Sequence, residues 1–84
     1  MAAVYRYVLE QRAAEFILAL AEDEQDLTRS FLRWLAANPD RAGDANHRDS
    51  NGRLNQAHLC GPFTIVVWTD HAVCEVRVVE VMKD

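Results

Sequence analysis

The first twenty residues change from an alternating to a helical spacing of hydrophobic positions. Residues 4–9 read Val-Tyr-Arg-Tyr-Val-Leu, and a strand would place Tyr5 and Tyr7 on one face. The hydrophobic residues that follow are spaced as on one face of a helix: Ala13, Phe16, Ile17 and Leu20. The pattern therefore predicts a short strand followed directly by a helix.

A second helical stripe follows the acidic stretch of residues 22–26. Its hydrophobic positions are Leu27, Phe31, Trp34 and Leu35, and the positions expected to face water are Gln25, Arg29 and Arg33. Asp23 is a suitable N-cap, and Asn38-Pro39 is a typical helix end. Because only a short turn separates the two helices, we expect an antiparallel helical hairpin.

Residues 39–53 contain almost no hydrophobic residue, and Asp, Arg, Gly, Asn, His and Ser dominate them. Asn51-Gly52 within this segment is a strong turn signal. We therefore expect a long polar loop, and loops of this length in small domains are usually functional or disordered.

The period of β-structure returns in the C-terminal third of the chain. Three strands are predicted, at residues 54–60, 63–69 and 73–81, with turns at Gly61-Pro62 and Asp70-His71. In the last strand, Cys74, Val76 and Val78 share the face expected to be buried. The sequence thus predicts one α+β domain over residues 1–84: an N-terminal strand, a helical hairpin and a three-stranded antiparallel meander.

Composition and charge restrict the function classes. Half of the 84 residues are hydrophobic, yet the longest apolar run, residues 16–21, is far too short to cross a bilayer. No secretory signal pattern opens the chain, so we expect a cytoplasmic protein without a membrane partner. Cys60 and Cys74 lack metal-ligand spacing, and reduced packing residues are favoured over a disulfide.

The net charge of −4 comes from a single acidic cluster: Glu22, Asp23, Glu24 and Asp26. Acids and bases balance over the rest of the chain, which argues against tight general binding to nucleic acid but is compatible with a local basic groove. The chain contains no P-loop, dinucleotide fingerprint, nucleophile elbow or metal-ligand cluster, so we expect neither a cofactor nor a metal.

The candidate catalytic residues are polar side chains of the loop and the meander: His47, Arg48, Arg53, His58 and Arg77. Arginines that clamp a phosphate beside an imidazole are a sensible constellation for RNA cleavage. The alternative is that the loop residues are solvated and that Arg77 pairs with Glu75, with Glu80 or with a neighbouring strand. Trp34 and Trp68 are either base-stacking platforms or, as their positions favour, core residues.

Three segments carry a resemblance that extends over nearly the whole chain: AAEFILAL, FLRWLAANP and GPFTIVVWTDHAVCEVRVVEV. Together with the order of elements, they resemble the RelE/ParE superfamily of toxins from bacterial toxin–antitoxin modules. RelE-like members cut messenger RNA on the ribosome without a metal, and ParE-like members poison DNA gyrase. The resemblance also implies an antitoxin whose disordered segment folds along the toxin surface.

At two places the sequence lacks the residues that many members of the family carry for RNA cleavage. Thr64 follows Phe63 where many members carry an arginine, and in the tail only Lys83 could act in place of the usual arginine, histidine or tyrosine. We therefore expect a toxin-like component of a type II module, acting on translation or gyrase. The alternative is a non-catalytic protein-binding module that retains the fold. A second copy of the chain is a further candidate partner, because a small core leaves apolar surface to cover.

Overall fold

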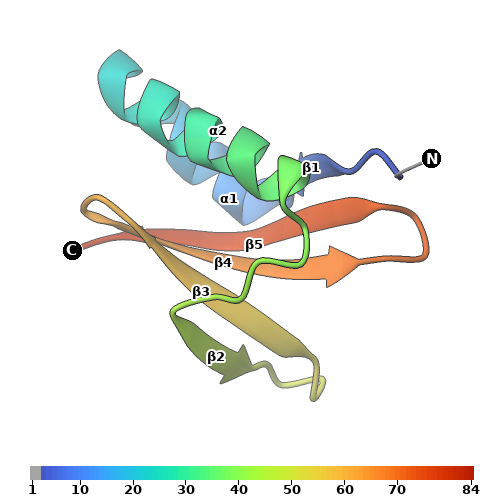
Figure 1. Ribbon diagram of the computed structural model, residues 1–84. Coiled ribbons are helices and arrows are strands. Elements are labelled where there is room, and N and C mark those ends of the chain that lie inside the picture. Colours follow the sequence, from blue (N-terminus) through green and yellow to red (C-terminus); the bar gives the residue numbers. More distant parts are fainter. Residues whose placement is uncertain (1–2) are drawn as a thin grey trace.

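The computed structural model describes residues 3–84 and contains two helices and five strands (Figure 1). In chain order the elements are β1 (Arg6–Leu9), α1 (Gln11–Leu18), α2 (Glu22–Ala37), β2 (Ala45–Arg48), β3 (Leu54–Cys60), β4 (Phe63–Asp70) and β5 (Glu75–Lys83). The α+β class and the predicted order of strand, two helices and sheet are confirmed.

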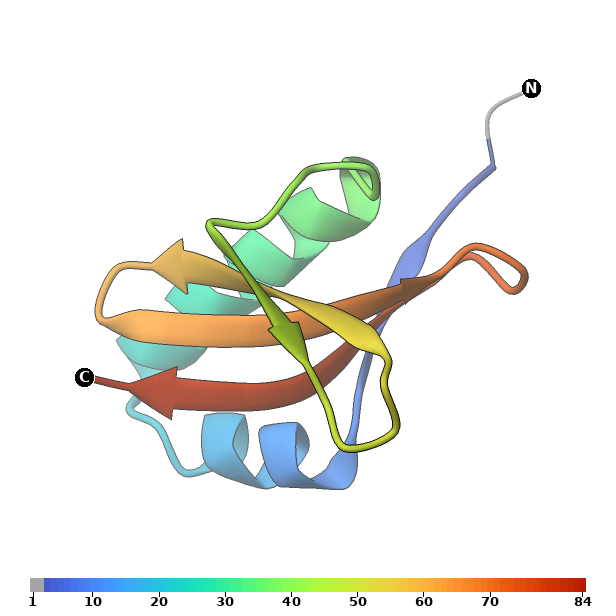
Figure 2. The same cartoon turned by 90° about the horizontal axis from the view of Figure 1, so that it is seen from below.

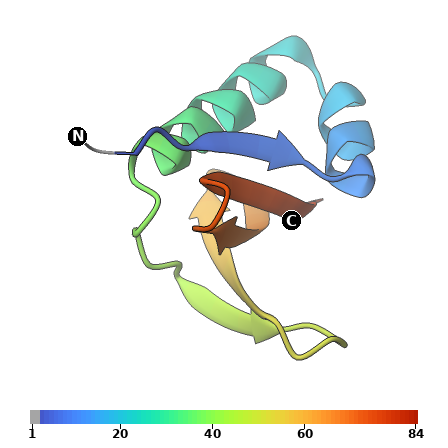
Figure 3. The same cartoon turned by 90° about the vertical axis from the view of Figure 1, so that its right-hand side faces the viewer.

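All five strands form one twisted sheet in the order β1-β5-β4-β3-β2. The N-terminal strand β1 lies parallel to the C-terminal β5, and every other neighbouring pair is antiparallel. Both helices cover the same face of the sheet, and β2 lies at the edge farthest from them (Figures 1 and 3). We call the opposite, uncovered face the open face.

The core lies between the helices and the central strands, since hydrophobic side chains of both layers are buried there. Its members are Ala13 and Ile17 of α1, Leu32 and Leu35 of α2, Cys60 of β3, Phe63, Ile65 and Val67 of β4, and Val76, Val78 and Val81 of β5. The two helices run in opposite senses on one side of the sheet, as expected of a helical hairpin (Figure 2).

The predicted long loop and three-stranded meander are wrong in one respect, because residues 45–48 form a fourth antiparallel strand. Ala45 pairs with Ala57 and Arg48 with Leu54, so β2 extends the meander beyond β3. Every residue of β2 is exposed. A strand that is held by backbone pairing and buries no side chain shows no hydrophobic alternation, and the sequence pattern could not reveal it.

Helix α2 buries only part of the predicted stripe, since Leu35 is buried and Phe31 packs against the core as expected. Thr28 and Leu32 are fully buried, whereas Leu27 and Trp34 are each 43% exposed. The buried Thr28 hydroxyl donates to the carbonyl oxygens of Glu24 and Gln25, which satisfies its polar group within the helix. Trp34 is therefore not a core residue.

The turn between the helices also differs from the prediction. The N-cap of α2 is Ala21, so Asp23 lies inside the first turn, where its charge still favours the helix dipole. The Gln25 side chain is half-buried rather than fully exposed. Its Nε2 donates to the carbonyl oxygens of Leu18 and Leu20, 3.3 and 3.1 Å away, and so satisfies the end of α1.

Strand β5 contains an irregularity that shifts its buried face. Val67 pairs with Val78 and Val66 pairs with Glu80, so Val79 is an extra residue in β5. This bulge explains why Val76 and Val78 are buried but the next core residue is Val81. Cys74, predicted on the buried face, instead lies in the β4–β5 turn with a left-handed φ of 56°.

Candidate functional site

The β2–β3 pairing decides which predicted polar residues can act together. His47 lies opposite Asn55, and both line a pocket on the open face. Arg53 lines the same pocket. Arg48 lies opposite Leu54, and its Nη1 donates to the carbonyl oxygen of Gly52 at 2.6 Å. Two of the six predicted residues, His47 and Arg53, therefore meet at one site.

This open-face pocket has a volume of about 280 Å³ and lies where the β2–β3 turn folds back over the sheet. Its polar lining comes from three separate parts of the chain, residues 10–12, residues 47–55 and Glu80, and its apolar lining comes from Val66 of β4 and Val79 of β5. The lining residues are Glu10, Arg12, His47, Asp49, Ser50, Asn51, Arg53, Asn55, Val66, Val79 and Glu80.

Asp49 holds the turn above the pocket. Its Oδ1 accepts hydrogen bonds from the backbone N–H groups of Asn51 and Arg53, both at 2.9 Å, and its Oδ2 lies 3.4 Å from the Arg53 Nε. Burial raises the pKa of Asp49, but these amides and the guanidinium outweigh it and hold the pKa below its usual value. Asp49 therefore remains charged and keeps the turn in place.

Asn55 is the buried polar residue of the pocket, with only 3% of its surface exposed. Its Nδ2 donates to the Oδ2 of Asp49 at 3.4 Å, whereas its Oδ1 has no hydrogen-bond partner among residues 3–84. A buried acceptor without a donor costs about 1–3 kcal/mol. The sequence offered no signal for Asn55, because only the fold of the turn buries it.

The arginines of the open face are largely engaged by neighbouring groups. The Arg53 guanidinium lies 4.4 Å from the centre of the Trp68 ring. Arg77 pairs with Glu75 at 3.0 Å and approaches Glu10 at 3.7 Å. Trp68 is thus partly buried beside the pocket rather than a core residue. Arg77 forms the ion pair with Glu75 that was the alternative to a catalytic role.

Lys83 lies outside the open-face pocket. Its Nζ is 2.7 Å from the Oε2 of Glu24, so it ties the end of β5 to the first turn of α2. An exposed or half-exposed pair of this kind contributes little to stability. The structure does not bring Lys83 together with His47 and Arg53.

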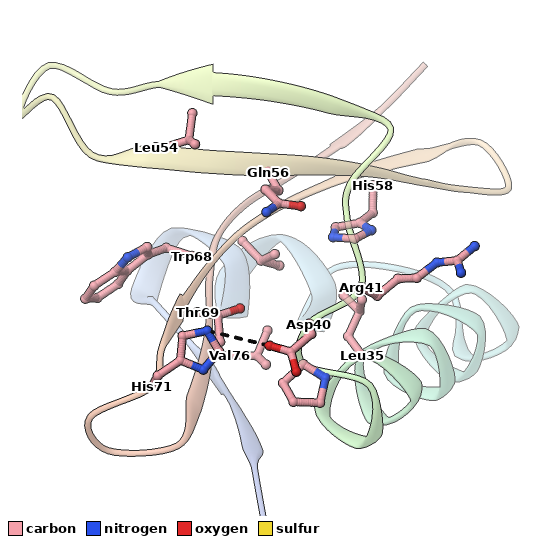
Figure 4. Close-up of a pocket in the computed structure, with 12 residues that line it drawn as sticks. Leu35, Asp40, Arg41, Leu54, Gln56, His58, Trp68, Thr69, His71 and Val76 are labelled. Atoms are coloured by element: carbon pink, nitrogen blue, oxygen red, sulfur yellow. Dashed lines mark ion pairs between the residues drawn. The ribbon is translucent and has the colours of Figure 1, made fainter.

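A second pocket, the helix-side pocket, lies between the end of α2 and the sheet (Figure 4). Its volume is about 320 Å³. Gln56 and His58 project toward it from β3, and the Nε2 of His71 lies 3.9 Å from the Oδ1 of Asp40 at its rim. The Tyr5 hydroxyl lies 2.7 Å from the His71 Nδ1, so three distant segments meet there.

His58 belongs to the helix-side pocket and not to the site that contains His47. It is 4% exposed, and the centre of its ring lies 5.8 Å from the centre of the Phe31 ring. Burial holds the pKa of His58 below its ordinary value of 6.5, with Arg41 adding to this effect and Asp44 opposing it. His58 is therefore mainly a neutral packing residue.

The lowered pKa of His58 predicts a loss of stability in mild acid. The folded state binds the proton less readily than the unfolded state, so this stability is present above pH 6.5 and is lost as the pH falls below that value. Urea unfolding at about pH 7.5 and about pH 5.5 should show this decrease. The His58→Gln variant should show a smaller decrease, and equal decreases in both proteins would contradict the prediction.

Within residues 3–84, no group of three or more histidine, cysteine or acidic side chains is arranged to hold a metal ion. Neither helix in this part of the chain has the length and apolar character needed to span a membrane.

Comparison with known proteins finds a likeness among solved structures. No protein-family model matches the chain, and no curated protein matches it. Among solved structures, it is similar to a chain of the toxin–antitoxin complex RelBE2 from Mycobacterium tuberculosis, with a TM-score of 0.80 and 16% identity. The likeness covers 98% of this chain and 100% of that one. The protein therefore shares the fold of that chain over its whole length, and the RelE-like fold that the order of its elements predicted is confirmed.

Proposed function

We propose that this protein is the toxin component of a type II toxin–antitoxin module, that it acts on RNA, and that an antitoxin neutralises it. The observation that carries the proposal is the end-to-end likeness to a chain from a toxin–antitoxin complex. The open-face pocket supports RNA as the target, because it combines the His47 imidazole with the Arg53 guanidinium.

The proposed reaction needs no metal. The 2′-hydroxyl oxygen attacks the adjacent phosphorus and the bond to the 5′-oxygen breaks. His47 takes the proton of the 2′-hydroxyl, and the leaving 5′-oxygen receives a proton from solvent. Arg53 stabilises the negative charge on the phosphate as the new bond forms. Asp49 positions Arg53 through the turn that both residues share.

The ion pairs on the open face favour a second candidate function, protein binding without catalysis. Arg53, Arg77 and Arg12 each lie within 4 Å of a carboxylate of the chain itself, namely Asp49, Glu75 and Glu80. Cations paired in this way attract phosphate less strongly than free ones. The alternative is a module that retains the fold and acts through protein contacts without catalysis.

Induced expression of the chain in bacteria tests the proposal. We expect growth to stop, and co-expression of a short neighbouring reading frame to restore it. The double variant His47→Ala/Arg53→Ala should grow normally, whereas Arg33→Ala, an exposed arginine on α2, should still arrest growth. Added to a translating extract, the wild-type protein should cleave messenger RNA and the double variant should not.

Two outcomes would decide against parts of this proposal. Normal growth at confirmed expression of the folded wild-type protein would contradict a toxin of any kind. Growth arrest that persists in the folded double variant, without RNA cleavage, would favour the non-catalytic binding module.

A further inference from the structure

The helix-side pocket contains a buried imidazole that has no hydrogen-bond partner. His58 is 4% exposed, and its ring faces the pocket (Figure 4). No group among residues 3–84 forms a hydrogen bond with either ring nitrogen, yet the one fully enclosed side-chain atom without a partner in this part of the chain is Asn55 Oδ1. The His58 nitrogens are therefore not fully enclosed. Burial keeps the pKa of His58 below 6.5, so the neutral ring offers a ligand one acceptor and one donor.

Gln56 places a donor beside this imidazole. Its Oε1 accepts a hydrogen bond from the backbone N–H of Gly43, which fixes the amide and leaves the NH₂ group as its free end. Gln56 and His58 lie two residues apart on β3, so both side chains leave the same face of the strand, and their Cα atoms are roughly 7 Å apart. Figure 4 shows both side chains projecting toward the pocket. One amide group of a ligand can span this separation with a hydrogen bond at each end.

The rest of the helix-side pocket favours a small uncharged ligand with an apolar body. Leu35, Val67 and Val76 provide apolar lining. The charged groups stay outside, because the Asp40 side chain is 91% exposed and the Arg41 guanidinium points away from the other lining residues (Figure 4). The volume of about 320 Å³ lies at the lower end of the range for small-molecule sites.

We propose that the helix-side pocket binds a free, small, uncharged planar molecule that carries a carboxamide or lactam group. The Gln56 NH₂ group donates to the carbonyl oxygen of this molecule, and a ring nitrogen of His58 accepts from its N–H. The flat body of the ligand lies against the apolar lining. This site is separate from the open-face pocket and does not depend on the proposed cleavage of RNA.

Benzamide, benzoate and benzamidine form a matched set of probes, because they share a shape and are neutral, anionic and cationic at neutral pH. Titration of the intact protein with each, followed by amide chemical shifts in NMR, should show benzamide binding at least about tenfold more tightly than either charged probe. The shifts should concentrate on residues 39–41 and 56–58 and on Val67. Equal affinities, no binding of benzamide, or shifts confined to the open-face pocket would overturn the proposal.

The His58→Phe variant keeps a flat ring at the buried position and removes both nitrogens. It should bind benzamide at least about tenfold more weakly, and a thermal melt will show whether it folds. Leu59→Phe is the control, because it introduces the same side chain at the next position of β3, where Leu59 is 62% exposed on the opposite face. Unchanged affinity in folded His58→Phe would overturn the proposal, and the three probes decide the matter on the wild-type protein even if that variant fails to fold.

Uracil tests whether RNA is the source of the bound group, because its ring contains the same pairing of carbonyl and N–H. An oligouridylate that bound in the helix-side pocket more tightly than free uracil would overturn the assignment to a free small molecule. Equal or weaker binding of the oligonucleotide would support that assignment.

Discussion

Replacing Phe63 with alanine should lower the free energy of unfolding by about 3–5 kcal/mol. The Phe63 side chain is 0% exposed and lies in the core cluster with Ile17 and Leu32, so truncation leaves a cavity between sheet and helices. A domain of this size has a total stability of only about 5–15 kcal/mol, so the variant should be close to unfolding at 37 °C. Urea unfolding followed by far-ultraviolet circular dichroism measures the change.

Two further variants test whether the cavity is what lowers the free energy of unfolding in Phe63→Ala. Phe63→Leu keeps most of the volume and should cost less than about 1.5 kcal/mol if neighbours repack. Leu59→Ala, at a residue 62% exposed in the adjacent strand, should cost about 0.5 kcal/mol or less. If Phe63→Ala were no more destabilising than Leu59→Ala, the proposed core would be wrong.

Replacing Gly43 with valine should destabilise the protein by about 1–3 kcal/mol and release β2 from the sheet. A Cβ atom at residue 43 would lie 2.9 Å from the carbonyl oxygen of Ala57 and 2.9 Å from the Gln56 Cβ, closer than atoms can approach. The Gly43 N–H also donates to the Gln56 Oε1. Because the backbone of β3 cannot move away, the segment leading into β2 must shift and carry His47 with it.

Amide hydrogen exchange can show whether Gly43→Val loosens β2 alone or the whole protein. The backbone amides of β2 should exchange faster in Gly43→Val, while those of β4 and β5 change only as global stability changes. The control is Ala45→Val, which adds similar bulk at an exposed position of β2 itself. If both variants exchanged alike in β2, steric exclusion at residue 43 would not be what holds this strand.

Much of the fold was predictable because its elements bury one face. The β3 bounds, residues 54–60, agree with the structure, and β4 ends one residue later than expected. Phe63, Ile65 and Val67 alternate into the core as a half-buried strand requires. The prediction was only half right for α2, because Leu35 and Phe31 pack into the core as expected but Leu27 and Trp34 are exposed. A helix with hydrophobic residues on several sides does not reveal which side will be covered.

The candidate site was predictable only in part. His47 and Arg53 were recognised by residue type, and the β2–β3 turn brings them into one pocket. Arg48 was separated from them by strand alternation, which places consecutive side chains on opposite faces. His58 was separated because it lies on the face of β3 that the helices cover. Residue chemistry alone cannot make these distinctions without knowledge of the pairing register.

The sequence by itself determined the α+β class, the order of the elements and the burial of Val76 and Val78 in β5. These features follow from periodic hydrophobic positions, which act locally and are readable along the chain. Only the tertiary structure decided that residues 45–48 form an edge strand, that β1 lies beside β5, and that Asn55 is buried beneath the turn of Asp49. These features depend on backbone pairing between distant segments, which leaves no pattern in the side chains that it joins.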